Sequence, residues 1–217
     1  METIEVPLFL LANFDSMTIR TPLTSIRGYT DVMLEGVAGP ITEDQQHYLK
    51  IIKSNAERLW KIFGILLDAQ RYIVYRQSVT SSNLKVWELM DFWDEEIKLH
   101  PKLHTTIKVS DDEILLWGDQ IHVHKALECA VHLIEDITTD GLENEITIMS
   151  LQNANATTLQ FEFSRTDITE GEYFDSYIDP YRFVMQRVME LHNGTFELKD
   201  APAEKMQIIL TFPNSVK

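Results

Sequence analysis

The side chains with the widest chemical range in this sequence are seven histidines and a single cysteine. His100 and His104 have the four-residue spacing that lets two imidazoles share a metal ion on one helical face, but a proline between them interrupts any helix. His122 and His124 are two residues apart, so on a helix they point to different faces. Cys129 alone forms neither an internal disulfide nor a cysteine-rich metal site. We therefore expect no metal site among these residues.

The net charge of the chain is −15, and it is unevenly distributed. Residues 1–75 carry 7 basic and 9 acidic side chains, whereas residues 76–217 carry 12 basic and 25 acidic ones. An acidic surface repels polyanions, which argues against nucleic acid or an anionic membrane as a partner. The apolar run at residues 8–12 is too short to span a bilayer, and no basic segment precedes it. We expect a cytoplasmic protein that binds neither nucleic acid nor membrane.

The first unit, residues 1–75, has the pattern of a helical hairpin. Apolar residues are dense from position 6 to position 37, where a segment with two glycines and a proline, Gly36–Pro40, ends the helix. Thr42 and Gln45 have the spacing of a capping box, in which each side chain binds the backbone N–H of the other residue. The second helix is therefore predicted to begin at Thr42.

A stripe of apolar residues follows the second helix at alternating spacings of three and four. A stripe of this kind is typical of a coiled-coil seam. Two hairpins that join their stripes form a four-helix bundle, so we expect a homodimer. The alternative is that the second unit covers the stripe within one chain. The predicted dimer seam consists of Leu49, Ile52, Ala56, Leu59, Phe63 and Leu66.

Residues 76–83 are polar and without periodicity, which indicates a linker. Residues 84–217 then alternate between helical and strand patterns, and the strands have one apolar face. This predicts an α/β sandwich, and an α+β protein overall. The expected helices cover residues 86–100, 121–137 and 181–191, and the expected strands cover 105–109, 114–117, 145–151, 158–163, 195–199 and 206–212.

Several short motifs of the chain match one known pattern. The first unit contains Arg20-Thr21-Pro22-Leu23, Ile26-x-Gly28-Tyr29 and Leu66-Leu67-Asp68. With the Gly-Pro turn, these motifs resemble the dimerisation and histidine-phosphotransfer hairpin of sensor histidine kinases. The second unit resembles the ATP-binding domain of these kinases more weakly, through Gly118-Asp119, Tyr173-Phe174-Asp175 and Glu190-Leu191-His192-Asn193-Gly194. The resemblance implies a place in two-component signalling.

The residues that perform the chemistry of that family differ here. Where the family has its phospho-accepting histidine and an acid, this chain has Met17 and Thr18, and a thioether has no nitrogen to phosphorylate. Cys129 and Leu133 stand where asparagines of the ATP domain hold Mg²⁺, and leucine cannot bind a hard cation. The adenine-binding Asp-x-Gly-x-Gly motif aligns with Arg165, Asp167 and Thr169, and the family's flexible lid and glycine-rich phosphate loop are missing. The resemblance thus implies an inactive homologue without a cofactor.

The motif around Met17 suggests what such a homologue does. In the family this surface of the hairpin docks receiver domains, so the partner is expected to be a response regulator or an active histidine kinase. One alternative is a response-regulator phosphatase, because Thr21 matches the family position that orients a water for dephosphorylation. Another is a small-molecule sensor that re-uses the former ATP pocket, with Arg165, Tyr173 and Tyr181 near it. The expected partner-binding residues are Met17, Thr18, Arg20, Thr21 and Thr24.

Overall fold

The computed structural model describes residues 16–74, 78–100, 103–109, 113–137, 144–164, 172–201 and 205–214, with the side chains at 16, 17, 74, 109, 144 and 172–179 left out. Contacts within the chain divide it into two compact units, Met1–Arg76 and Gln77–Lys217. Among the helices of the described residues, none is both long and apolar enough to cross a membrane.

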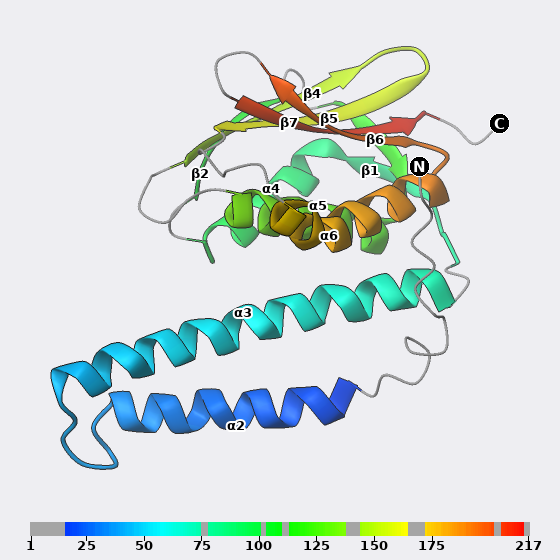
Figure 1. Ribbon diagram of the computed structural model, residues 1–217. Helices are drawn as coiled ribbons and strands as arrows, with labels where there is room; N and C mark the ends of the chain where they lie inside the picture. Colours follow the sequence, from blue (N-terminus) through cyan, green and yellow to red (C-terminus); the bar gives the residue numbers. More distant parts are fainter. Residues whose placement is uncertain are drawn as a thin grey trace. The chain divides into compact units, whose positions relative to one another are not determined.

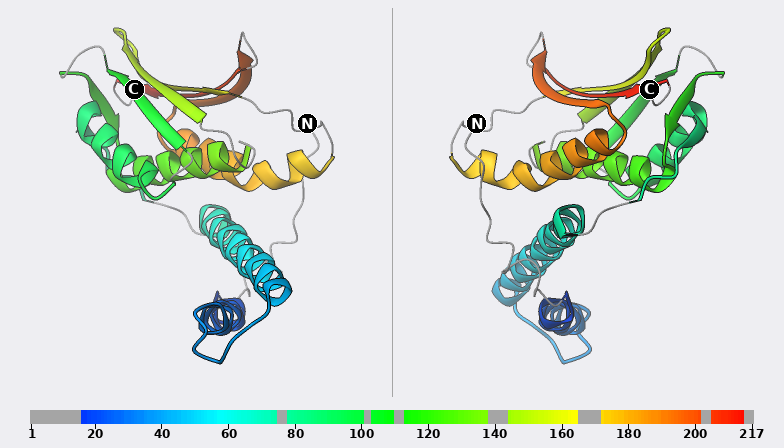
Figure 2. Two further views of the ribbon diagram at one scale, coloured as in Figure 1. Left: turned by 90° about the vertical axis from the view of Figure 1, so that its left-hand side faces the viewer. Right: turned by 90° about the vertical axis from the view of Figure 1, so that its right-hand side faces the viewer.

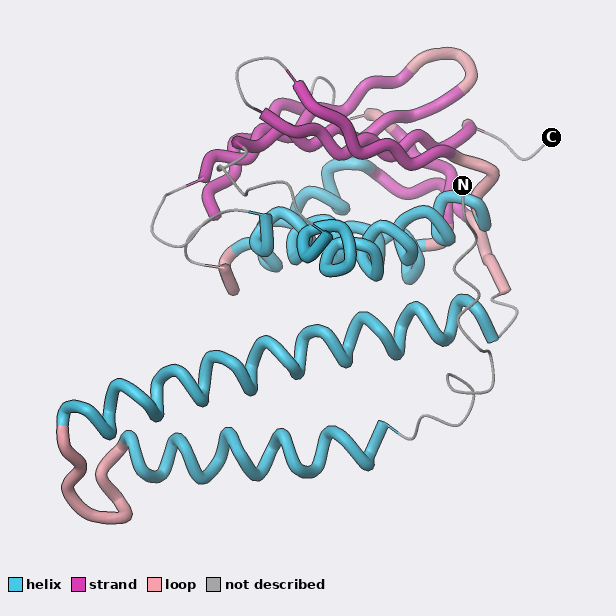
Figure 3. Tube along the Cα trace, in the orientation of Figure 1, coloured by secondary structure: helices cyan, strands magenta, loops and turns pink. Residues whose placement is uncertain are grey.

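The first unit is a hairpin of two antiparallel helices, α2 (Ser16–Leu34) and α3 (Glu43–Val74) (Figures 1 and 3). In the turn, Gly36 and Gly39 have φ angles of 74° and 111°, which side chains with a Cβ rarely adopt. The backbone N–H of Thr42 donates to Gln45 Oε1 at 2.9 Å, and the N–H of Gln45 donates to Thr42 Oγ1 at 3.2 Å. The predicted capping box is therefore confirmed.

A lone hairpin has little interior. In α2 and the first half of α3, the buried residues are Leu23, Thr30, Leu49 and Ala56. Lys53 Nζ lies 2.6 Å from Asp31 Oδ1 and so links the two helices, but both side chains are 37% exposed. Exposed ion pairs contribute little to stability, so the packing of the helices must supply most of it.

The second unit is built on a five-stranded sheet in the order β2-β4-β5-β7-β6. Strands β2 and β4 are parallel, and the other neighbours are antiparallel. Alternate residues of β5 and β7 are buried on one face, which confirms the predicted period of two. The strands are β2 (Leu103–Val109), β4 (Asn144–Gln152), β5 (Ala156–Ser164), β6 (Thr195–Ala201) and β7 (Lys205–Pro213).

Three helices cover one face of this sheet, which confirms the predicted α/β sandwich and the α+β class (Figure 2). They are α4 (Val86–Ile97), α5 (Gln120–Ile137) and α6 (Glu172–Leu191). α5 contacts both α4 and α6, so it is the middle helix of the layer. Trp93 of α4 stacks on Phe161 of the sheet with ring centroids 4.6 Å apart, which fixes the helix layer against the strands.

Two elements differ from the sequence-based expectation. Strand β1 (Ser82–Lys85) pairs antiparallel with β3 (Leu115–Gly118), although its first two residues were assigned to the linker. Leu84 is the single buried residue of β1, so the strand has no alternation of buried and exposed residues that the sequence could reveal. Its backbone pairing with β3 makes it a strand. Helix α6 begins nine residues before the expected start at position 181, and Pro180 lies inside it rather than before it.

Asp119, the residue before α5, joins three segments of the second unit. Its Oδ2 accepts the N–H of Thr80 at 2.7 Å, and its Oδ1 accepts the N–H groups of Ile121 at 3.0 Å and His122 at 3.4 Å. The N–H of Asp119 donates to Nε2 of the buried His192 at 2.9 Å. The Asp119 carboxylate therefore caps α5 and binds the backbone of Thr80. The backbone N–H of Asp119 is bound by His192, which follows α6.

The turn after α6 orients His192 for this bond. His192 Nδ1 donates to the carbonyl oxygen of Val188 at 2.7 Å, so Nε2 is the acceptor. Asn193 has φ 55°, a left-handed conformation that ends the helix, and a Cβ at Gly194 would overlap the carbonyl oxygen of Thr211. The motif Glu190-Leu191-His192-Asn193-Gly194 thus forms a helix end in which the last three residues each have a structural requirement.

Both partners of this junction have shifted pKa values. Burial lowers the pKa of His192 below its ordinary value, and the nearby His122 lowers it further, against the opposing effects of the Val188 carbonyl and Asp119. Burial alone would raise the pKa of Asp119, but the N–H groups of Thr80 and His122 and the His122 ring outweigh it and lower the pKa. The fold therefore prefers a neutral His192 beside an ionised Asp119.

This preference predicts how stability depends on pH. Because the unfolded His192 takes up a proton near pH 6.5 while the folded one resists it, the free energy of unfolding should fall as the pH drops from about 7.5 to about 5.5. His192→Gln should lose about 1–3 kcal/mol at pH 7.5, because the bonds to Asp119 and Val188 are disturbed, and should show a smaller drop on acidification. Urea unfolding at the two pH values, followed by tryptophan fluorescence, measures both effects.

His124, whose pKa is also lowered by burial, should leave the variant a residual pH dependence. The matched control is His104→Gln, an exposed position on β2, which should keep the full wild-type drop. An equal drop in the wild-type protein and His192→Gln would show that His192 is not the group responsible.

Candidate functional site

The expected partner-binding surface lies on the first two turns of α2. Thr18, Arg20, Thr21 and Thr24 are all exposed, and the Met17 backbone belongs to the same helix, although its side chain lies outside the described residues. The residues recur over two turns because helical positions three and four apart are neighbours. The described side chains offer hydroxyls and one cation, a surface suited to hydrogen bonding and to anionic groups.

The ring of Trp60 and the hydroxyl of Thr24 make contacts that hold this surface in place. The Arg20 guanidinium lies 5.6 Å from the ring centroid of Trp60 on α3, a distance at which a cation and an aromatic face attract. Arg27 approaches the same ring at 6.0 Å. The Thr24 hydroxyl donates to the carbonyl oxygen of Arg20 at 2.8 Å, so it is used locally. Trp60 therefore holds α2 and α3 together beside the exposed Thr21.

The residues of the expected dimer seam fall into two groups. Leu49 and Ala56 are buried within the chain, and Phe63 is half-buried. Ile52 and Leu59 are 46% and 45% exposed, and Leu66 is exposed as well. On α2 a second apolar row, made of Ile26, Tyr29 and Met33, is also exposed. Only part of the predicted stripe is thus covered within the hairpin.

The two positions of α5 that align with the Mg²⁺-binding asparagines of the family lie in the core. Cys129 and Leu133 are one helical turn apart on α5, and they are 1% and 0% exposed. Neither side chain offers the oxygen that Mg²⁺ requires. Arg165, Asp167 and Thr169 lie outside the described residues. Tyr181, expected near that pocket, is buried, and its ring centroid lies 6.2 Å from that of His132.

The histidine pairs considered from the sequence are separated in the fold. His124 stacks on Phe92 with centroids 4.0 Å apart, whereas His122 Nε2 lies 3.3 Å from the Ser78 carbonyl oxygen, so the two rings have different neighbours. His104 is exposed on β2, whereas His100 is buried and lies beside His132 of α5, with ring centroids 5.1 Å apart. Thirty-two positions separate these two residues, so no local spacing could have paired them.

Residues 18–72 match the family of His Kinase A phospho-acceptor domains. A segment of 53 residues is 38% identical to the circadian input-output histidine kinase CikA of Synechococcus elongatus; it makes up 24% of this chain and 7% of that protein. The matched segments span 7 to 17% of the length of the curated relatives.

Two solved structures share the fold over most of this chain. The histidine kinase AdeS of Acinetobacter baumannii is 13% identical, with a TM-score of 0.56 over 93% of this chain and 100% of that one. The histidine kinase ThkA, solved in complex with the response regulator protein TrrA, is 17% identical, with a TM-score of 0.61 over 92% of this chain and 60% of that one. Residues 18–72 therefore match the phospho-acceptor domain of histidine kinases, and the chain shares the fold of solved histidine kinases over most of its length.

Proposed function

We propose that this protein is a catalytically inactive member of the family that works as a dimeric adaptor or regulator. It binds a response regulator or an active histidine kinase through the surface formed by Met17, Thr18, Arg20, Thr21 and Thr24. The observation that carries the proposal is the burial of Cys129 and Leu133, because these positions would have to present Mg²⁺ ligands to a nucleotide. The exposed hairpin surface supports a binding function that needs no nucleotide.

Inactivity is supported at two separate steps of the reaction. Phosphoryl transfer to the hairpin needs a nucleophilic nitrogen, and Met17 has none. ATP binding needs Mg²⁺ held by oxygen ligands, and Leu133 has none. Because the two losses lie in different units, neither one compensates for the other.

Dimerisation is supported by the apolar residues that one hairpin leaves uncovered. Ile52, Leu59 and Leu66 recur every seven residues on α3, and the row on α2 adds Ile26 and its neighbours. Rows of exposed apolar residues of this kind are typical of an interface. A second hairpin presents the same rows, so twofold symmetry matches the surface to itself.

The choice of partner rests on the family surface and on ThkA, which has the same fold and was solved with a response regulator. A second candidate function has one observation in its favour. Thr21 is exposed one turn after Met17, where its hydroxyl could orient a water toward a phosphorylated receiver. The small-molecule sensor receives no such support, because Cys129, Leu133 and Tyr181 are all buried, so the described residues near that position expose no surface for a ligand.

The dimer is tested by Leu59→Glu, which places a charge in the proposed interface twice per dimer. We expect the dissociation constant to rise at least about 100-fold, because burying an unpaired carboxylate costs several kcal/mol. Size-exclusion chromatography with light scattering over a concentration series gives the molar mass. Ser54→Glu, an exposed position five residues earlier on another side of α3, should remain dimeric. A monomeric wild-type protein would exclude the dimer.

Inactivity is tested with γ-labelled ATP and Mg²⁺. The protein should take up no label, and ATP with Mg²⁺ should leave its melting temperature unchanged. Met17→His supplies the missing imidazole but leaves Cys129 and Leu133 buried, so it should also stay unlabelled. An active histidine kinase assayed in parallel is the control. Labelling of Met17→His would show that the nucleotide site works and would contradict the proposal.

Partner binding is tested with a panel of purified receiver domains and histidine kinases from the source organism. At least one should bind, and Thr21→Arg should weaken that binding at least about tenfold by placing a bulky cation in the contact. Gln46→Arg, an exposed position near the hairpin turn, adds the same side chain away from the surface and should bind normally. Binding that Thr21→Arg leaves unchanged would place the contact elsewhere.

A mixture of this protein with a phosphorylated receiver domain distinguishes the adaptor function from the phosphatase function. An adaptor leaves the decay rate of the phosphorylated receiver unchanged, whereas a phosphatase accelerates it and loses the acceleration in Thr21→Ala.

A further inference from the structure

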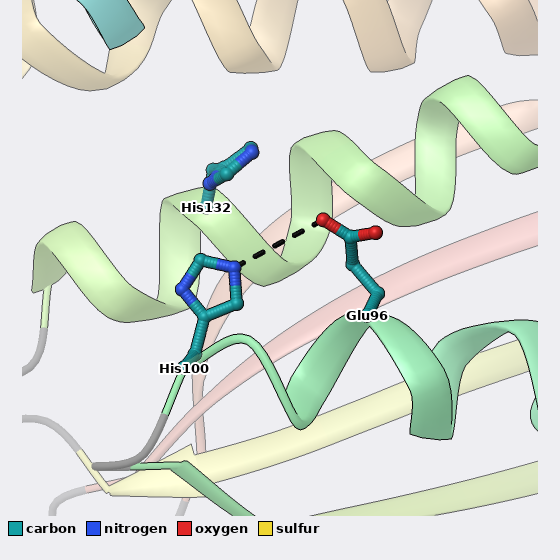
Figure 4. Close-up of side chains that lie close together, drawn as sticks. All are labelled: Glu96, His100 and His132. Atoms are coloured by element: carbon teal, nitrogen blue, oxygen red, sulfur yellow. Dashed lines mark ion pairs between the residues drawn. The ribbon is translucent and has the colours of Figure 1, made fainter.

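Three side chains with metal-binding atoms meet between α4 and α5 (Figure 4). Glu96 lies in the last turn of α4, His100 follows the end of that helix, and His132 projects from α5. One carboxylate oxygen and one nitrogen from each ring all lie within 4.8 Å of one another. His100 is 6% exposed, and the other two side chains are partly exposed, so the cluster is largely enclosed but reachable from solvent.

A second carboxylate fixes the tautomer of His100. Glu135 Oε1 lies 3.0 Å from His100 Nδ1, so Nδ1 carries the proton and donates it to Glu135. The other nitrogen, Nε2, points away from Glu135 and lies 4.0 Å from Glu96 Oε1, where it could bind a metal ion. A histidine that binds a metal through one nitrogen commonly donates its other N–H to a carboxylate in this way.

We propose that Glu96, His100 and His132 form a binding site for a divalent transition-metal ion of the zinc type. Two imidazoles and one carboxylate suit Zn²⁺, whereas Mg²⁺ and Ca²⁺ prefer oxygen ligands alone. Tetrahedral Zn²⁺ with bonds of about 2.0–2.1 Å brings its ligand atoms to about 3.4 Å from one another. The ligand atoms, now within 4.8 Å of one another, would approach that geometry through side-chain rotations. Water completes the coordination.

The surroundings favour a cation at this place. Glu128, whose Oε1 lies 4.0 Å from His132 Nε2, and Glu135 add two carboxylates beside the three ligands. The unit as a whole, residues 76–217, carries a net charge of −13. This site does not involve the former Mg²⁺ position, because Cys129 and Leu133 are buried in the core and His132 instead meets the end of α4. A bound ion would join α4 to α5.

The alternative is that His100 is simply an ion-paired histidine between Glu96 and Glu135. The two cases differ in what the neighbouring residues do. In an ion pair His132 has no part, whereas in a metal site it supplies one of three bonds. Glu96→Gln keeps the size of the side chain and removes its charge, and Glu135→Gln does the same for the outer carboxylate.

The test is titration of the chelator-treated full chain with ZnCl2, by calorimetry and by thermal unfolding. We expect one ion per chain and a rise in melting temperature. His132→Ala and Glu96→Gln should each weaken binding at least about 100-fold, and Glu135→Gln should weaken it about 10- to 100-fold. The control His104→Ala removes an exposed histidine of the same unit and should bind like the wild-type protein.

Circular dichroism checks that each variant is folded. If His132→Ala does not fold, the test rests on Glu96→Gln. Absence of a one-to-one complex at a tenfold excess of Zn²⁺ would overturn the proposal, and so would binding that both His132→Ala and Glu96→Gln leave unchanged. Co²⁺ provides an independent readout, because a tetrahedral complex with these ligands has intense visible absorption that His104→Ala should retain and His132→Ala should lose.

Discussion

Helix α5 is enclosed by the sheet and by the helices on both its sides, and this enclosure governs most of what the second unit can do. The buried positions of such a helix must be apolar, or each polar group at them must have a partner. Asp119 and His192 satisfy this at one end, where two hydrogen bonds cap the helix and two more join it to Thr80 and to the end of α6. Near the other end His132 finds its neighbours on α4. Cys129 and Leu133, one before and one after His132 in the sequence, belong to the core.

The hairpin has the opposite problem. Two helices side by side bury one face each, and α2 and α3 together leave rows of apolar residues in water. The ion pair between Asp31 and Lys53 is exposed and cannot compensate for that surface. The two units thus differ in how they bury apolar surface. The second unit has its own core between sheet and helices, whereas the hairpin needs another protein surface to cover its apolar rows. This division agrees with a protein that acts through contact rather than through chemistry on a nucleotide.

Local patterns were sufficient for much of this architecture. The capping box at Thr42 and Gln45 depends on neighbouring residues alone, and the burial alternation of β5 and β7 follows from the strand period. Strand β1 escaped prediction because its partner β3 begins 30 residues after it. The meeting of His100 with His132 escaped for the same reason, since only the packing of α4 on α5 brings them together. Positions 165, 167 and 169 remain predictions.

The complete burial of Leu133 also makes any polar substitution there costly. An asparagine restored at that position would place an amide where no water reaches it, at a cost of about 1–3 kcal/mol unless new partners arose at the same time. A second polar change at Cys129 would add a similar cost. Each step back toward a Mg²⁺ site would therefore lower stability before it restored any activity. Single polar substitutions at these two positions would therefore destabilise the core without completing a Mg²⁺ site.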